Sequence, residues 1–232
     1  MAAQCFQPVG GNRMRVIALD SCGTVKTGVG SMKIISDGFV SVARTAQYED
    51  PDEFIVKNAN GDICLNYRTN PVLKWVNLEF TFCKVDPEMI NVLTGSPLVL
   101  DDAATPAAVG FRTRENVVST VNFSIEVWTN LGGVACSGGT LEYGYYLVPW
   151  VVQGTLGDLT IENGPVSFVV NARSKSGSPW GTGPFNIRNT KVSPAPAKLI
   201  TAINALDHEH LQVVNLAPPA AACGATTVTP DA

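Results

Sequence analysis

The sequence predicts a mainly β fold with one short helix, and three observations support this prediction. Residues 75–82 alternate between apolar and polar side chains, which is typical of a half-buried strand. Residues 86–95 carry the clearest helix pattern of the chain. Most other apolar runs are short and are bounded by glycine, proline or asparagine, as strands joined by turns are. We therefore expect sheets to make up most of the molecule.

Strands are expected in the first part of the chain at residues 13–19 and 34–43. A connection containing glycine and serine, residues 20–30, separates them. Gly38 interrupts the second run, where it is expected to form a bulge.

Residues 44–71 differ in character and are expected to form a long hairpin inserted between two core strands. The runs 54–57 and 63–67 flank Asn60-Gly61, which is a strong signal for a hairpin turn. Ordering so long an excursion costs conformational entropy unless it packs on something. The hairpin is expected to pack either on its own body or on a neighbouring molecule.

The strand and helix that follow are expected to form part of the core. The apolar face of the strand comprises Val76, Leu78, Phe80 and Phe82. Asp86 is suited to cap the helix, and Pro87 fits the first helical position because its missing N–H would be unpaired there. The apolar stripe of the helix comprises Met89, Ile90 and Leu93. Gly95 supplies a left-handed stop.

The second half of the chain is expected to contain further strands and turns. Residues 96–108 are expected to form a loop and residues 131–140 a Gly-rich segment. Strands are expected at 109–114, 122–128, 141–153, 156–162, 166–173 and 210–216, with a turn at 163–165 and a turn-bound segment at 177–185. In residues 122–128, Phe123, Ile125 and Val127 alternate with Ser124 and Glu126. Pro149 restricts the aromatic run 141–153 to an edge strand or a kinked one.

The composition is unusually poor in charge. Hydrophobic residues make up 45% of the chain and charged residues 16%, against a usual quarter. A large core is one explanation, and a surface covered by other copies of the chain is another. With 232 residues, the chain is expected to form one domain, residues 1–216, followed by a flexible Pro- and Ala-rich tail, residues 217–232.

Charge and hydropathy exclude several functions. The net charge of −4 argues against a nucleic-acid binder, which needs a basic stripe. The longest apolar run, residues 145–152, is too short to span a membrane. Residues 1–16 lack the features of a signal peptide, so we expect a reducing cytoplasm and free, mostly buried thiols. The six cysteines are Cys5, Cys22, Cys64, Cys83, Cys136 and Cys223.

No pattern in the sequence predicts catalysis, a metal or a cofactor. His208 and His210 flank Glu209, but no third ligand is nearby, so a surface or core-edge pair is favoured over a metal site. The acids at 49–53 and 101–102 lack the spacing of a calcium loop. Nucleophile-elbow and phosphate-loop motifs are absent. A hydrolase that uses His208 or His210 is the weakest of the functions considered.

Several stretches of the chain form an ordered series. The main one is the strand followed by a helix at residues 78–88, with Leu93-Thr-Gly95 after it. The others are residues 15–23, 38–42, 58–61, 123–128, 144–149, 161–163, 180–184 and 210–216, then Pro218-Pro219 and Cys223-Gly224. In this order, the stretches resemble the major tail (tail tube) proteins of long-tailed, siphovirus-type bacteriophages of actinobacteria. The resemblance covers nearly the whole chain, although no single motif is diagnostic.

This resemblance implies a β-sandwich or partial barrel with a flanking helix. Six copies would close into a hexameric ring with a continuous inner β-barrel, and rings would stack into the tail tube of a virion assembled in the host cytoplasm. The helix would cover the sheet face away from the channel. The inserted hairpin would reach the next ring, which makes its residues candidate inter-ring contacts. These are Tyr48, Phe54, Ile55, Asn60 and Gly61.

The implied partners are other copies of the chain, the tape-measure, terminator and distal tail proteins at the tube ends, and phage DNA sliding through the lumen without specific binding. Such tails are flexible and have no sheath. Because a ring of six chains at −4 each carries −24, we expect an acidic lumen that repels phosphate. The alternative function is a soluble β-sandwich module that binds a ligand or carbohydrate, with the aromatic residues of 143–150 as its platform.

Overall fold

The structure is a computed structural model that describes residues 7–115, 121–132, 136–137, 140–159, 161, 163, 166–192 and 194–232. Within these residues the chain has seventeen strands and one helix, which confirms the mainly β prediction. The helix α1 spans Pro87–Thr94. The strands are β1 (Pro8–Leu19), β2 (Lys33–Ser36), β3 (Phe39–Tyr48), β4 (Glu53–Lys57), β5 (Ile63–Arg68), β6 (Leu73–Phe82), β7 (Leu98–Leu100), β8 (Ala108–Phe111), β9 (Asn122–Leu131), β10 (Cys136–Ser137), β11 (Thr140–Leu141), β12 (Tyr143–Leu156), β13 (Phe168–Ser174), β14 (Arg188–Asn189), β15 (Pro196–Ala197), β16 (His210–Val214) and β17 (Ala222–Thr226).

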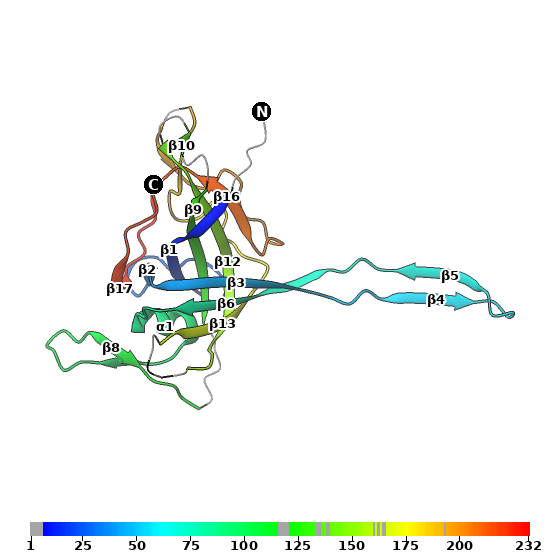
Figure 1. Cartoon of the computed structure of the whole chain (residues 1–232), viewed down its shortest axis with the longest axis horizontal. Coiled ribbons are helices and arrows are strands. Elements are labelled where there is room, and N and C mark those ends of the chain that lie inside the picture. Colours follow the sequence, from blue (N-terminus) through cyan, green and yellow to red (C-terminus); the bar gives the residue numbers. More distant parts are fainter. Residues whose placement is uncertain are drawn as a thin grey trace.

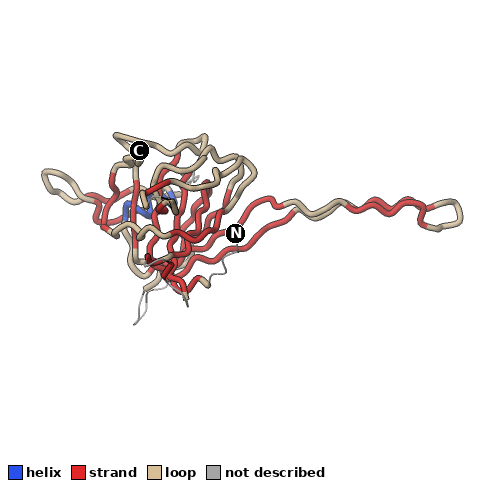
Figure 2. The backbone as a smooth tube through the Cα atoms, turned by 90° about the horizontal axis from the view of Figure 1, so that it is seen from above, coloured by secondary structure: helices blue, strands red, loops and turns tan. Residues whose placement is uncertain are grey.

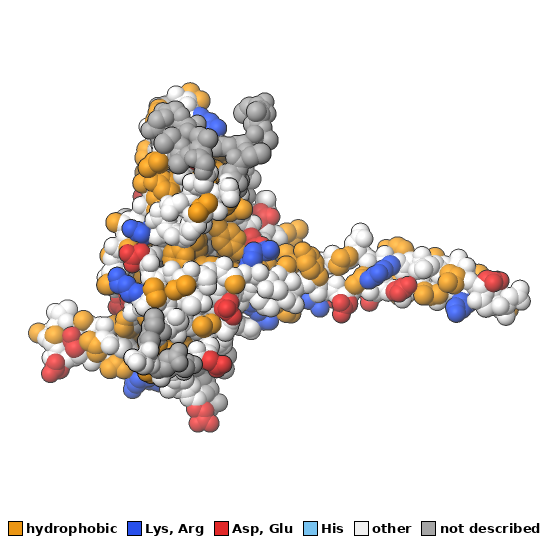
Figure 3. All heavy atoms as spheres, in the orientation of Figure 1, with side chains coloured by type: hydrophobic (Ala, Val, Ile, Leu, Met, Phe, Trp, Pro, Cys, Tyr) orange, Lys and Arg blue, Asp and Glu red, His pale blue; other side chains and the backbone are white. Residues whose placement is uncertain are grey.

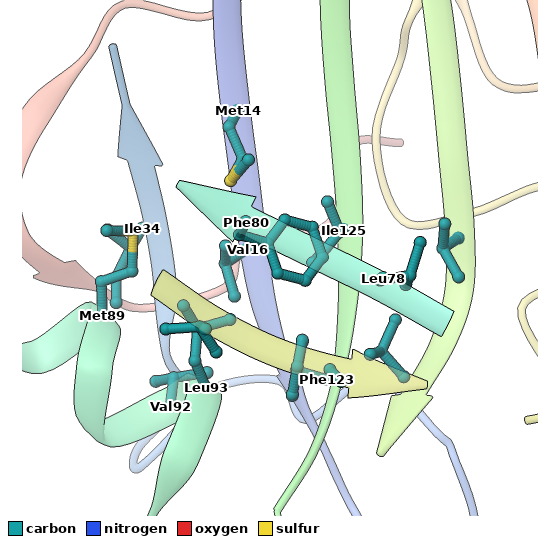
Figure 4. Packing of buried hydrophobic residues seen from close by; sticks show 14 of the residues in the cluster. Met14, Val16, Ile34, Leu78, Phe80, Met89, Val92, Leu93, Phe123 and Ile125 are labelled. Carbon is teal, nitrogen blue, oxygen red and sulfur yellow. The ribbon is translucent and has the colours of Figure 1, made fainter. Parts of the chain in front are cut away.

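Nine strands form one sheet with the order β17-β2-β1-β9-β12-β13-β6-β3 and β16 beside β12. The first half of β12 pairs with β16 and its second half with β13, so the sheet divides there. The sheet then folds over itself, and β6 and β13 cross β1 and β9 (Figure 4). Among the described strands no pairing joins β3 to β17, so the sheet does not close into a barrel.

A glycine lies in the short connection between β2 and β3. The sequence predicts one strand over residues 34–43, but Asp37 and Gly38 instead separate β2 from β3, which lie near opposite ends of the strand order. A side chain at Gly38 would place its Cβ 2.6 Å from the Lys84 carbonyl oxygen. The glycine is therefore not a bulge within one strand. It allows the chain to pass from one end of the sheet to the other.

The main core lies between the two layers of the folded sheet and α1 (Figure 4). It contains all six predicted core residues of the strand and helix, each at most 2% exposed: Leu78, Phe80, Phe82, Met89, Ile90 and Leu93. Asp86 caps α1 by accepting a hydrogen bond from Glu88 N at 2.9 Å, and Gly95 ends it with φ 75°. The predicted strand, helix and caps are confirmed.

A second core covers the opposite face of β1, β9 and β12. Its buried members are Ile17, Leu19, Trp128, Tyr145, Leu147, Trp150, Trp180, Phe185, Ile187, Leu199, Ile203, Val214 and Val228. Because β9 lies between the two cores, its second face is also buried, and Ser124 and Glu126 are 0% and 1% exposed. The polar side of the alternation in residues 122–128 is therefore not exposed to solvent.

The aromatic strand β12 is central rather than an edge strand. It pairs with β9 on one side and with β13 and β16 on the other. The alternative prediction, a kinked strand, is confirmed because the pairing with β9 shifts between Val148 and Val151. This irregularity accommodates Pro149, which has no N–H to donate to the ladder.

The segment 217–232 is not the flexible tail that its composition predicts. Strand β17 pairs with β2, and Val228 is 1% exposed. The carboxylates at the start of α1 bind this segment: Gly224 N donates to Asp86 Oδ2 at 2.5 Å, and Ala225 N donates to Glu88 Oε2. The sequence gives little sign of this docking because the segment's partners lie far from it in the chain.

The remaining differences concern hairpins. Residues 96–108, expected to be a loop, contain β7, which pairs with β8 in a short hairpin that leaves the body on the side away from the long arm described below (Figure 1). Strand β8 ends at Phe111, short of the predicted Arg114. The predicted strand 156–162 is not separate, because β12 ends at Leu156. Residues 160, 162, 164–165 and part of the Gly-rich 131–140 lie outside the described residues.

Candidate interaction surface

A two-stranded arm leaves the body and extends far beyond it (Figures 1 and 2). Strands β3 and β6 start the arm, and their pairing continues outward to Tyr48 opposite Leu73. Strands β4 and β5 continue it, with Phe54 opposite Tyr67. The predicted inserted hairpin is therefore present, and it does not pack on its own body.

The turn at the tip follows from the Asn-Ala-Asn-Gly sequence. The Asn58 side-chain oxygen accepts hydrogen bonds from Asn60 N at 3.0 Å and Asp62 N at 2.9 Å. Gly61 has φ 90°, a conformation that glycine adopts without strain. These local bonds hold the hairpin turn without any contact to the body.

Every residue of β4 and β5 is exposed. Residues directly opposite each other on paired strands share a face, and successive residues alternate between faces. The side chains on one face are Phe54, Val56, Leu65 and Tyr67, which we call the apolar face of the arm. They are 50–57% exposed, and large hydrophobic side chains are visible along the arm in Figure 3. An isolated hairpin is marginally stable in water, and a contiguous exposed apolar face is a candidate surface for contact with another protein.

The predicted contact residues lie in different parts of the arm. Tyr48 is 59% exposed at its start, and Phe54 belongs to the apolar face. Ile55 points to the opposite face, and Asn60 and Gly61 form the turn. Val56, Leu65 and Tyr67 share the apolar face with Phe54 but are not among the predicted contact residues. Leu65, Asn66 and Tyr67 alternate after the turn, which indicates their faces, whereas Phe54-Ile-Val-Lys before the turn does not alternate.

The edge of β3 is a second exposed feature. Among the described strands, β3 pairs only with β6, so its other edge carries unpaired backbone N–H and C=O groups. Its ten residues make it long for an open edge. Such an edge is a template for pairing with another chain.

Three contacts hold the base of the arm where it leaves the body. The Arg44 guanidinium of β3 donates two hydrogen bonds to Glu209, at 2.8 and 2.7 Å. The Val76 N–H of β6 donates to Ser174 Oγ at 2.8 Å, and His208 Nδ1 lies 2.8 Å from the same oxygen. The third contact places the Arg173 guanidinium over the Trp75 ring, 5.1 Å from its centroid.

The neighbouring hydroxyl completes the cluster around Glu209. Tyr146 of β12 donates its O–H to Glu209 Oε1. Burial and this hydrogen bond raise the pKa of Tyr146 far above its usual value. The hydrogen bonds that Arg44 donates to Glu209 likewise raise the pKa of Arg44. The sequence analysis favours a surface or core-edge pair over a metal site for His208 and His210. In the structure both make polar contacts within the protein: His208 contacts Ser174, and His210 Nε2 lies 3.1 Å from Gln212 Oε1.

The pH dependence of stability is expected to include a contribution from His208. Burial lowers the pKa of His208, and Glu209 offsets part of this effect. An unfolded histidine titrates near pH 6.5, so below about that pH the unfolded chain binds the proton more readily. The contribution of neutral His208 is thus present above pH 6.5 and lost as the pH falls toward the folded pKa. Thermal unfolding at pH 7 and pH 5 should show a smaller pH effect on Tm in His208→Gln than in the wild type.

A matching variant, His210→Gln, removes the other histidine and leaves the Ser174 contact intact. If His208→Gln has the wild-type pH dependence, burial of neutral His208 does not contribute to it.

Sites for other chemistry are not found in the described part of the chain. No group of three or more His, Cys, Asp or Glu side chains is placed to hold a metal ion there. Tyr145 and Trp150, proposed for a carbohydrate platform, are 1% and 6% exposed and belong to the core. Within the same residues, no helix is long and apolar enough to cross a membrane.

The prediction of mostly buried thiols is wrong for the cysteines whose side chains are described. Cys22, Cys64, Cys83 and Cys223 are free and exposed. Cys5 lies outside the described residues. Cys64 is on the arm and Cys223 is on β17.

Comparisons with known proteins do not identify the chain. No protein-family model matches it, and no curated protein matches it.

Proposed function

We propose that this chain is the tail tube protein of a long-tailed, siphovirus-type bacteriophage of actinobacteria. The observation that carries the proposal is the arm, whose apolar face has no partner within the described chain. The ordered series of sequence resemblances, from residues 15–23 to Cys223-Gly224, supports it independently. In this proposal other copies of the chain cover the arm.

Assembly completes the surfaces that the single chain leaves open. Six copies form a ring in which the open edge of β3 pairs with a neighbour, and the sheets join into a continuous inner barrel. The arm extends to the adjacent ring, where its apolar face is buried. Head-to-tail contacts of this kind generate closed rings or open filaments according to their rotation. The tail tube fold, the hexamer and the β-sandwich description all belong to this proposal.

The function of the tube is mechanical and electrostatic. Phage DNA passes through the lumen into the host cell, so the wall must not bind phosphate. The net charge of each chain is −4, and a net acidic lumen repels DNA along the channel. The tube starts and ends on tape-measure, terminator and distal tail proteins, and it is assembled in the host cytoplasm and carried by the virion. The chain acts without catalysis or a cofactor.

Sedimentation velocity of the purified protein tests self-assembly directly. Raising the protein concentration should convert monomers to species of six chains and then to much larger ones. A single monomeric boundary at every concentration, together with affinity for a sugar, would favour a soluble binding module instead.

A further inference from the structure

Among the described strands, the arm pairs only within itself beyond its base, so the contacts at the base must set the direction in which it points. The last β13 residue paired with β6 is Arg173, opposite Asn77. Beyond this point, Ala46, Gln47 and Tyr48 of β3 pair only with Val76, Trp75 and Leu73 of β6. A small change of angle at the exit therefore moves the distant tip by a large distance.

One short segment binds both strands of the arm at this exit. Glu209 binds Arg44 of β3 through two hydrogen bonds, and His208 contacts Ser174, whose hydroxyl accepts the Val76 N–H of β6. Residues 208 and 209 directly precede β16, which is paired with β12 in the body. The segment thus links the arm to an element that is not part of it.

Tyr146 fixes the orientation of the Glu209 carboxylate in this link. Its hydroxyl donates to the same Glu209 oxygen, Oε1, that accepts from Arg44 Nε. Strands β12 and β3 are separated by β13 and β6 in the sheet order. Glu209 therefore bridges two strands that are not paired through their backbones. Because both the Arg44 guanidinium and the Tyr146 hydroxyl donate to it, the carboxylate has a defined orientation.

We infer that Glu209, fixed by Tyr146, is the positioning residue that sets the angle of the arm for assembly. The expected effect of Glu209 on tube assembly rests on the proposed function, whereas its expected effect on the direction of the arm does not. A pre-oriented arm loses less conformational freedom when it binds a neighbour, so assembly begins at a lower concentration.

The arm angle can be measured with the protein's own thiols. Cys64 on the arm and Cys223 on the body are both exposed. With the other four cysteines replaced by serine, spin labels at these two positions report the distance between arm and body below the assembly concentration. We expect Glu209→Gln and Tyr146→Phe to broaden the distance distribution, and Asp37→Asn to leave it unchanged. Asp37 forms a longer ion pair with Lys84, at 3.6 Å, away from the arm, so this variant removes a carboxylate charge without changing the arm base.

Assembly and stability provide the second readout. The critical concentration for assembly should rise about two- to five-fold in Glu209→Gln, the range expected for losing one solvent-accessible ion pair. Its Tm should fall by no more than about 3 °C. The inference would be overturned if the distance distribution were unchanged in both Glu209→Gln and Tyr146→Phe. It would also be overturned if the assembly defect were accompanied by a large loss of Tm, because unfolding would then explain the defect. If the wild type never assembles, the proposed function fails, while the distance measurement still decides the role of Glu209.

Discussion

Replacing Leu65 with aspartate is expected to abolish tube formation and leave the monomer folded. Leu65 lies in the apolar face of the arm, opposite Val56, and is 50% exposed in the single chain. An exposed substitution changes the free energy of unfolding by only about 0.5 kcal/mol. In an assembled tube, however, the new carboxylate would be buried without a partner at every copy, at a cost of several kcal/mol each. Sedimentation and electron microscopy measure the assembly, and circular dichroism measures the fold.

The adjacent residue provides a matched control. Asn66 is on the same strand but on the opposite face, opposite Ile55. Asn66→Asp adds the same charge at the same distance along the arm, and tubes should still form. If Leu65→Asp assembles as well as Asn66→Asp, the apolar face is not an interface between copies.

Replacing Glu126 with glutamine is expected to destabilise the monomer severely. Glu126 accepts hydrogen bonds from Arg15 at 2.5 and 2.6 Å and from the Tyr145 hydroxyl at 2.6 Å. Arg15 and Glu126 are 5% and 1% exposed, and the guanidinium also lies over the Phe185 ring at 3.9 Å. Removing one member of a buried pair leaves an uncompensated charge, which costs about 3–5 kcal/mol. Urea unfolding monitored by tryptophan fluorescence measures this loss.

Two further variants separate pairing from burial. Glu49→Gln breaks an exposed pair with Lys74 at 3.8 Å and should change the free energy of unfolding by less than about 1 kcal/mol. The triple variant Arg15→Met, Glu126→Leu and Tyr145→Phe removes both charges and the hydroxyl that donates to Glu126, and it should recover much of the stability lost in Glu126→Gln. If Glu126→Gln costs no more than Glu49→Gln, the buried pair is not a major contribution to the fold.

Sequence patterns predicted the elements that depend on interactions between residues close together in the chain. The alternation of residues 75–82, the Asp86 and Pro87 start of α1 and the Asn-Gly turn of the arm each depend on neighbours in the chain, and the structure contains all three. Pro149 was ambiguous because its missing N–H can be accommodated at an edge or at a bulge. The bulge in β12 is the outcome.

The features that were missed depend on contacts between distant residues. Gly38 divides β2 from β3 because Lys84 approaches it closely. The alternation in its strand suggests that Glu126 is exposed to solvent. It is buried instead, and Arg15 and Tyr145 donate hydrogen bonds to its carboxylate. The 217–232 segment is docked by Asp86 and Glu88, more than a hundred residues earlier. No single-sequence pattern reports such pairings.

The interaction surface was predicted in part for the same reason. The existence of the arm follows from the Asn60-Gly61 turn and the flanking apolar runs. Which side chains share its apolar face depends on the register between β4 and β5, which pairs Phe54 with Tyr67 and Val56 with Leu65. The role of Glu209 at the arm base depends on a contact with Arg44 that crosses 165 positions in the chain.

Electron microscopy of the purified wild-type protein, at concentrations where it sediments as large species, tests the central claim most directly. The proposal predicts hollow cylinders built of stacked six-fold rings, with density for the arm of each copy lying against the adjacent ring. Compact single molecules at all concentrations, with the arm free in solvent, would contradict it.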